Sequence, residues 1–394
     1  MDETTSHRAP AGAPTPEAER SLAPDLARGA ALLGIALANS VYYVNAPEYG
    51  ARSRPVGGSP LDGAADLLLV ALVDGRWLPL FAALFGYGAV QMTRRQSASG
   101  HDLKAVRRLQ RRRFGWLTAF GLAHLLLLFG GDILAIYGIL GFGLLLMLRA
   151  RDRTLLASAG AALVAAVPLA ALVGMPPFGT AVRNGIPSLL TGDPWEALVL
   201  RAAAWPLDVV LLSLSAFAPM LLGVWAARRG VLDDPNRHRS LLRRTALIGI
   251  PAGAAGGVPL GLIAAGLWSA GTWATFLASV LHVLTGFAAA LGAGAAFALA
   301  AAGRAGRGGP VARALTATGR RSLSCYLAQS VVFVALFAPY AGGLGDDLGT
   351  AAMAAAAALT WLATVLAAGL AARTGRRGPA EALLRRLTYR RRTR

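Results

Sequence analysis

The chain has 394 residues, of which 55% are apolar and only 15% are charged. An ordinary soluble protein carries about 25% charged residues, so this chain has too few to cover a soluble surface of its size. Apolar stretches of membrane-spanning length recur between residues 28 and 372. These features predict an all-α polytopic integral membrane protein and exclude most soluble enzyme folds.

The net charge is +19, with 39 basic residues against 20 acidic ones. The basic residues lie in short runs between apolar segments, and no zinc-finger, RNA-binding or helix-turn-helix pattern accompanies them. We therefore expect no nucleic-acid partner and interpret the charge by the positive-inside rule. The single cysteine, Cys325, excludes an intrachain disulfide and a cysteine-based metal cluster, and we predict no metal site.

Three regions follow one another along the chain. Residues 1–21 are read as a disordered cytoplasmic tail, 22–375 as a single transmembrane helical domain and 376–394 as a basic cytoplasmic C-terminal tail. Residues 61–73 are apolar but short and contain Asp66, which predicts an interfacial or re-entrant helix on the outer side; an eleventh span is the alternative. The ten predicted spans are 28–46, 76–93, 114–130, 132–149, 154–175, 206–227, 245–267, 273–302, 322–341 and 350–372.

Charge counting orients these spans. With the N-terminus inside, 34 of the 39 basic residues fall on the inner side and five on the outer side. Both termini are therefore predicted to be cytoplasmic. The five outer residues are Arg52, Arg54, Arg76, Arg183 and Arg201.

The first span and the stretch that leads into the second carry polar residues that suit binding. Arg28 and Asn39 are three helical turns apart and share a face; Arg28 either holds a phosphate or carboxylate at the inner mouth of a cavity or anchors the topology. Asp66, Asp74 and Arg76 should pair or line water, and the alternative is an interfacial ion pair with a Trp anchor.

His124 is the strongest candidate for chemistry. It lies about 11 residues beyond Arg113, near the predicted middle of the membrane, where an ionisable side chain indicates function; a neutral histidine bonding across helices is the alternative. Asp132 either orients His124, if the chain folds back after the Gly130-Gly131 pair, or caps the fourth span. Tyr137 is expected to line the same cavity.

Later segments are less specific. The outer segment 176–205 predicts a short helix at the headgroup level, and small residues in the late spans predict close helix packing. The polar residues at the start of the ninth span, among them Gln329 and Ser330, are expected to satisfy one another across helices. His282 has no polar neighbours in sequence and is interpreted as structural.

Five motifs in chain order between about residues 22 and 390 resemble those of the YeiB family, bacterial membrane proteins with the domain of unknown function 418. They are Arg28-Gly29 with Gly34 and Asn39; Leu80–Gly86; His124 with Gly131-Asp132-Ile133-Leu134 and Tyr137; Gly319-Arg320 with Tyr326-Leu327-Ala328-Gln329-Ser330; and Gly378-Pro379-Ala380-Glu381 with Arg385-Arg386-Leu387-Thr388-Tyr389. The chain has Ser324-Cys325 where the family often has Thr-Asn.

The family is distantly similar to transmembrane acyltransferases of the heparan-glucosaminide acetyltransferase type, which use an intramembrane histidine. The resemblance implies acyl transfer from cytoplasmic acyl-CoA to an outer-side small-molecule, lipid or glycan acceptor. His124 would then be the base or acyl carrier, oriented by Asp132 or Asp74. The donor would bind Arg28 and the cluster Arg111, Arg112 and Arg113; the substrate-binding candidates are Asn39, Arg76, Tyr137 and Gln329.

Two other function classes stay open, a small-molecule or lipid transporter and a non-catalytic membrane scaffold. A tunnel with His124 at its waist would favour transfer, one wide central cavity between two similar halves would favour transport, and dry packing would favour a scaffold. We expect no permanently bound cofactor, with acyl-CoA as the co-substrate of the transfer hypothesis. The expected partners are membrane lipids and the acceptor, and the sequence leaves a homo-oligomer open.

Overall fold

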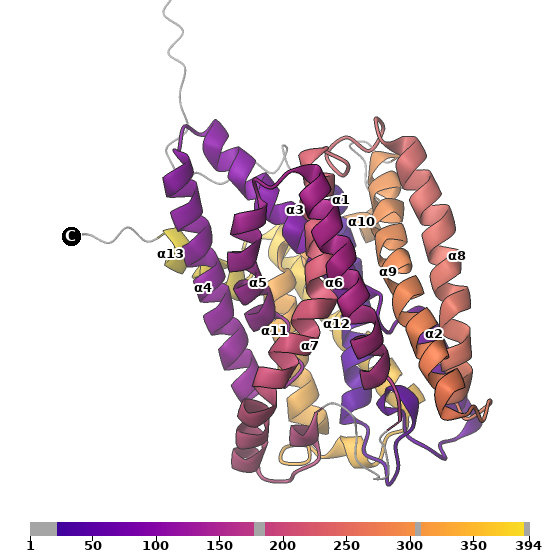
Figure 1. The fold of residues 1–394 in the computed structure, drawn as a ribbon. Coiled ribbons are helices and arrows are strands. Elements are labelled where there is room, and N and C mark those ends of the chain that lie inside the picture. The colour runs from indigo at the N-terminus through magenta and orange to yellow at the C-terminus, as the bar shows by residue number, and fades with distance from the viewer. Residues whose placement is uncertain (1–21, 177–185, 304–308, 390–394) are drawn as a thin grey trace, which may run out of the picture.

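A computed structural model describes residues 22–176, 186–303 and 309–389 of the chain. Within these ranges the regular elements are all helices, with no β-strand, as the sequence predicts (Figure 1). The tail predicted for residues 1–21 lies outside the described part.

Each of the ten predicted spans is occupied by a helix, although the ends differ by several residues. These helices are α1 (Leu22–Ser40), α3 (Trp77–Ala98), α4 (Leu103–Leu127), α5 (Leu134–Met147), α6 (Asp152–Val173), α7 (Pro194–Arg228), α8 (Arg239–Ala264), α9 (Thr272–Ala302), α11 (Ser322–Phe337) and α12 (Thr350–Arg373). Three shorter helices accompany them, α2 (Pro60–Leu72), α10 (Pro310–Arg320) and α13 (Pro379–Tyr389).

Six segments in the described ranges are long and apolar enough to cross a membrane, which supports a polytopic membrane protein. They are Pro60–Ala98, Asp152–Val173, Pro194–Arg228, Arg239–Ala264, Thr272–Ala302 and Thr350–Arg373. Helices α5 and α11 are apolar but have only 14 and 16 residues. Helix α4 carries a run of arginines in its first half, which lowers its mean hydropathy.

Three local expectations need correction. The first helix begins at Leu22 and ends at Ser40, so the last part of the predicted span 28–46 is instead a 3-10 turn, η2 (Val41–Tyr43), and a loop. Residues from Pro194 onward do not form a separate headgroup helix, because α7 runs unbroken from Pro194 to Arg228. The region between the eighth and ninth spans contains the unexpected helix α10.

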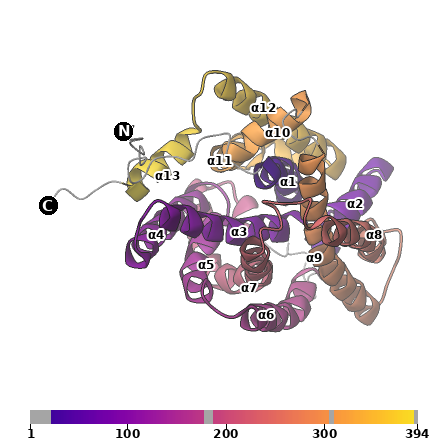
Figure 2. The ribbon, with the colours of Figure 1, turned by 90° about the horizontal axis from the view of Figure 1, so that it is seen from above.

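Helix α1 is the centre of the arrangement. Seen from above, it is surrounded by α3, α9, α10, α11 and α12, all of which it contacts (Figure 2). Helices α4 to α7 form one flank and α2, α8 and α9 another. Helix α13 packs against α4 and α11, so part of the predicted C-terminal tail is attached to the bundle.

Glycines let the helix backbones approach one another closely. A Cβ at Gly86 of α3 would lie 2.1 Å from the Met220 carbonyl oxygen, and one at Gly223 of α7 would lie 2.0 Å from that of Ala83. The same reciprocal contact joins α1 and α10, where a Cβ at Gly319 would lie 1.8 Å from the Asp25 carbonyl oxygen. Such contacts are typical of membrane helices. The hydrophobic effect does not hold helices together in lipid, so they associate through the close packing that small residues allow.

We predict that Gly86→Ala and Gly319→Ala each destabilise the protein by about 1–3 kcal/mol, because the added methyl meets a backbone atom that cannot turn away. Thermal unfolding of the detergent-purified protein measures the effect. Gly369→Ala in α12 is the control, since a Cβ there meets nothing within 4 Å. It should be neutral or stabilising by up to ~1 kcal/mol through helix propensity. Equal unfolding temperatures for all three variants would contradict the packing argument.

Candidate functional site

A large cavity with a volume of about 1700 Å³ lies at the end of the bundle where α1 begins. The first turns of α1, the end of α3, and helices α4, α10, α11 and α13 contribute to its walls. Nine arginines line it: Arg28, Arg95, Arg113, Arg313, Arg320, Arg321, Arg376, Arg377 and Arg385.

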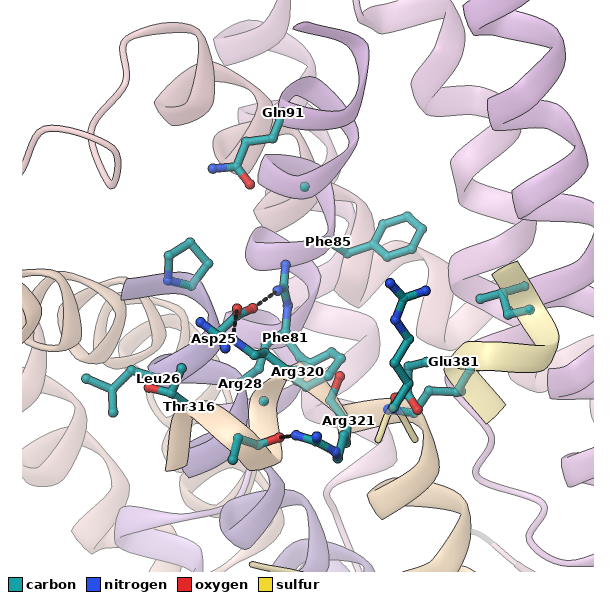
Figure 3. Close-up of a pocket in the computed structure, with 18 of the residues that line it drawn as sticks. Asp25, Leu26, Arg28, Phe81, Phe85, Gln91, Thr316, Arg320, Arg321 and Glu381 are labelled. Carbon is teal, nitrogen blue, oxygen red and sulfur yellow. Dashed lines mark hydrogen bonds and ion pairs between the residues drawn. The ribbon is translucent and has the colours of Figure 1, made fainter. Parts of the chain in front are cut away.

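The two acidic residues among the described lining side chains are both engaged. Asp25 lies between Arg28, at 2.9 Å, and Arg320, at 3.5 Å (Figure 3). Glu381 of α13 accepts hydrogen bonds from the Leu323 and Ser324 backbone N–H groups and so caps the N-terminus of α11. The mouth of the cavity therefore carries a large excess of positive charge, which favours an anionic ligand.

The deep end of the cavity is aromatic. Phe85 packs against Phe114 and Tyr137, with ring centroids 5.7 and 5.4 Å apart, and Phe81 stacks on Tyr137. The Tyr137 hydroxyl donates to the Leu78 carbonyl oxygen at 3.0 Å. A ligand with an anionic head and an apolar end matches this polarity gradient.

His124 lies just beyond the deep end, in the last turn of α4. Its Nδ1 is 2.8 Å from Asp132 Oδ1, and its Nε2 is 2.8 Å from Ser330 Oγ. The Tyr326 ring, which lines the cavity, is 4.9 Å from the His124 ring. Because a carboxylate only accepts hydrogen bonds, Nδ1 carries the ring proton and Nε2 accepts from the Ser330 hydroxyl.

The chain reversal after α4 explains how Asp132 reaches His124. Helix α4 ends at Leu127, and the chain turns through 128–133 before α5 begins at Leu134. Asp132 Oδ1 thereby meets His124, while Oδ2 accepts from the Ala135 N–H at 2.7 Å and caps α5. The sequence left open whether Asp132 orients His124 or caps the following helix, and in the structure it does both.

Two further groups hold this corner. Gly121 admits α5, because a Cβ there would lie 1.9 Å from Ala135 N and 2.6 Å from Asp132 Oδ2. Arg201 of α7 is buried and donates to the Leu128 carbonyl oxygen at 2.9 Å, just past the end of α4. A cation at this position donates hydrogen bonds to the C-terminal carbonyl groups of the helix and interacts favourably with the negative end of the helix dipole.

A second, small space lies on the other side of Tyr326. Its volume is about 10 Å³, roughly enough for one water molecule. Ser330, Asn39 and Gln329 line it with Tyr326 and apolar side chains. Among the described residues, only Tyr326 lines both spaces.

The remaining predicted binding residues divide between these places. Arg28 and Tyr137 line the large cavity, and Asn39 and Gln329 line the small space. Of the predicted arginine cluster only Arg113 lines the cavity; Arg111 is exposed elsewhere on α4, and Arg112 donates to the Leu387 carbonyl oxygen of α13.

Asp74 and Arg76 do not join His124 and belong to a separate buried cluster. Asp74 pairs with Arg54 at 2.7 Å, and Arg54 also lies 3.3 Å from Asp66. The Arg76 guanidinium donates to the Val70 and Gly253 carbonyl oxygens and to the backbone oxygen of Asp74, so the expected Asp74–Arg76 side-chain pair is wrong. Of the two carboxylates expected to orient His124, Asp132 contacts its ring and Asp74 does not.

The separate cluster also corrects the interpretation of two other residues. His282 has polar company, because its Nδ1 is 3.4 Å from Arg76. Arg54 is fully buried; burial lowers its pKa, but the carboxylates of Asp74 and Asp66 more than offset this, so the pKa lies above its ordinary value and the guanidinium stays charged. Neither cavity is lined by any member of this cluster.

Sequence reasoning missed Ser330 as a partner of His124, since it lies 206 residues away. It also gave no binding role to Arg320, Arg321 or Glu381, although the family-like motifs contain Arg320 and Glu381. The signal for Ser330 was its place in the Tyr326-Leu327-Ala328-Gln329-Ser330 motif, four residues and about one helical turn after Tyr326.

Comparison with known proteins supports the resemblance drawn from the motifs. Residues 226–391 match the family described as Protein of unknown function (DUF418). Uncharacterized protein YxaH of Bacillus subtilis (strain 168) is 28% identical, over 95% of this chain and 96% of its own length. Uncharacterized protein YeiB of Escherichia coli (strain K12) is also 28% identical, over 94% and 97%. No solved structure matches the chain.

We predict that Arg54→Gln destabilises the protein by about 3–5 kcal/mol, because it leaves two buried carboxylates without their shared cation. Thermal unfolding in detergent measures the loss. Arg52→Gln is the control, since Arg52 is partly exposed and its Nε lies 3.7 Å from Asp74. Its cost should stay below about 1 kcal/mol, and an equally large loss in both variants would contradict the assigned pairing.

Proposed function

We propose that this membrane protein, which is similar to YeiB and YxaH, transfers an acyl group from a cytoplasmic acyl-CoA to an acceptor on the outer side of the bacterial plasma membrane. One observation carries the proposal. A histidine held by a carboxylate lies next to an arginine-lined cavity, with its ring 4.9 Å from the ring of Tyr326, which lines that cavity.

The cavity suits the donor. Its arginine mouth offers hydrogen-bond donors and positive charge for the phosphates of a CoA, with Arg113, Arg313 and Arg385 on three different helices. The aromatic deep end, with Phe85 and Tyr137, suits the uncharged acyl end of the molecule. Acyl-CoA is thus a co-substrate in this proposal, with no permanently bound cofactor.

His124 supplies the proton chemistry. Asp132 holds the tautomer in which Nε2 carries no proton and can accept one, and it stabilises the imidazolium that forms. The acceptor, an outer-side hydroxyl or amine on a small molecule, lipid or glycan, would approach from the side of Asn39 and Gln329, where the small space of about 10 Å³ has to widen to admit it.

The topology proposed with this function has ten spans and both termini inside. All nine cavity arginines belong to segments that the charge count assigns to the cytoplasmic side. Asn39, at the opposite end of α1 from Leu22, belongs to the outer side in the same arrangement. A cytoplasmic donor and an outer acceptor would therefore meet at His124.

Export of a small anion or lipid is the second candidate, because a large cavity closed beyond Tyr326 also fits the inward-open state of a transporter. A transporter would not consume acyl-CoA, so the measurement that tests transfer also separates the two. A dry scaffold is disfavoured by a cavity of about 1700 Å³.

His124→Gln should lower acyl-CoA consumption at least ~100-fold, because an amide can hydrogen-bond but cannot accept the proton. Asp132→Asn should also lower it, while Asn still caps α5 and the unfolding temperature stays close to wild type. The assay is release of free CoA from acetyl-CoA by the purified protein, in a membrane extract as acceptor source. His282→Gln is the control, since this buried histidine lines neither cavity. Full activity in His124→Gln would refute the proposed chemistry.

Reporter fusions test the topology. A fusion at Gly100, between α3 and α4, should behave as cytoplasmic, and one at Gly192, just before α7, should behave as external. The reason is the distribution of the basic residues, 34 against five. The opposite pattern would invert the proposed donor and acceptor sides.

A further inference from the structure

Ser330, His124 and Asp132 form a hydrogen-bonded chain of a hydroxyl, an imidazole and a carboxylate. Both links are 2.8 Å long, and all three residues are at least 95% buried. This order of groups is the arrangement that activates a serine for covalent catalysis, and it is recognised by geometry rather than by order in the chain.

The surroundings fix each member from a different element. Asp132 is held by the start of α5 through the Ala135 N–H, and His124 by the last turn of α4. Ser330 lies in α11, whose N-terminus is capped by Glu381. The alignment therefore does not depend on one flexible loop.

Ser330 also has access to a space, whereas His124 lines neither the large cavity nor the small one. Asn39 lines the small space beside Ser330 and has a side-chain amide; Gln329 lines the space too, but its Nε2 donates to Thr364 Oγ1 at 3.4 Å. Amide N–H groups are the donors that commonly stabilise the oxyanion of an acyl-transfer intermediate. The donor cavity is on the other side of Tyr326, so the ring of Tyr326 must move for the acyl carbon to reach Ser330.

From this geometry we propose that Ser330 is a nucleophile that carries the acyl group as a covalent ester between donor and acceptor. The proposal rests on the proposed acyl transfer and deepens it. It makes the reaction a two-step relay in place of direct attack by the acceptor on the thioester. The donor can then leave before the acceptor enters.

The steps balance without a further reagent. Ser330 Oγ attacks the thioester carbonyl carbon as His124 Nε2 takes the hydroxyl proton; the carbon–sulfur bond breaks, and the CoA sulfur leaves with that proton. The acceptor hydroxyl or amine then attacks the ester carbonyl carbon and gives its proton to His124. The bond from the acyl carbon to Ser330 Oγ breaks, and Oγ regains the proton.

The test uses purified full-length protein and radiolabelled acetyl-CoA without any acceptor. The relay predicts a rapid burst of about one CoA per protein molecule and a label on the peptide that contains Ser330, as acyl-enzyme accumulation requires. Direct transfer predicts neither until an acceptor is added. Acid quenching and peptide mass spectrometry locate the label.

Three variants sharpen the result. Ser330→Ala should lose both burst and label and lower turnover at least ~100-fold. Ser330→Cys should keep the burst but carry a thioester, which neutral hydroxylamine cleaves much faster than the serine ester. Ser279→Ala is the control, since this buried serine donates only to the Ala171 carbonyl oxygen on another pair of helices and should behave as wild type.

The possible outcomes separate the relay from the proposed function on which it rests. Turnover near wild type in Ser330→Ala, or a label on His124 in place of Ser330, would overturn the relay and leave acyl transfer standing. A wild-type protein that neither releases CoA nor takes up label, with membrane extract present or absent, would overturn the proposed function together with the relay.

Discussion

A single carboxylate joins the chemistry of this protein to its architecture. The two oxygens of Asp132 accept from groups with different tasks, the His124 ring and the backbone N–H of Ala135 at the start of α5. In a membrane interior, water is scarce and each buried polar group needs a partner in the protein. The turn between α4 and α5 satisfies this constraint and fixes the histidine tautomer at the same time. Gly121 leaves the space that the turn requires.

Both groups of charged or titratable residues in this protein, Arg54 with its two carboxylates and His124 with Asp132, are buried. They differ in whether their neighbours line a cavity. Arg54, Asp66 and Asp74 neutralise one another in a region that lines neither space, which suits a structural role. His124 is equally buried, but its partner Ser330 and its neighbour Tyr326 both line spaces. Nine arginines and two carboxylates line the large cavity, so its net charge is positive and favours an anionic ligand.

The sequence predicts the helices and the central histidine because both depend on local features. Ten apolar segments give ten helices, and His124 is recognisable as an ionisable residue within one of them. Helical periodicity could not give the contact between His124 and Asp132, since it assumes that the helix continues, whereas α4 ends at Leu127.

Pairings between distant segments were inaccessible for a related reason. Arg54 enters a charge count only as an outer basic residue, and nothing local indicates that it pairs with Asp74. Helices α10 and α13 are short and rich in arginine, so they read as loops and tails although they help to form the cavity.

The capping of α11 by Glu381 has consequences for how the protein is made. Helix α4 emerges from the ribosome long before α11, and the stabilising carboxylate of α11 follows some 57 residues after Ser324. Ser330, the partner of His124 Nε2, follows it by 206 residues, so His124 is synthesised well before this partner. Helix α13, which carries Glu381, follows later still, so a chain that stops before α13 leaves the N-terminus of α11, the helix of Ser330, without its cap.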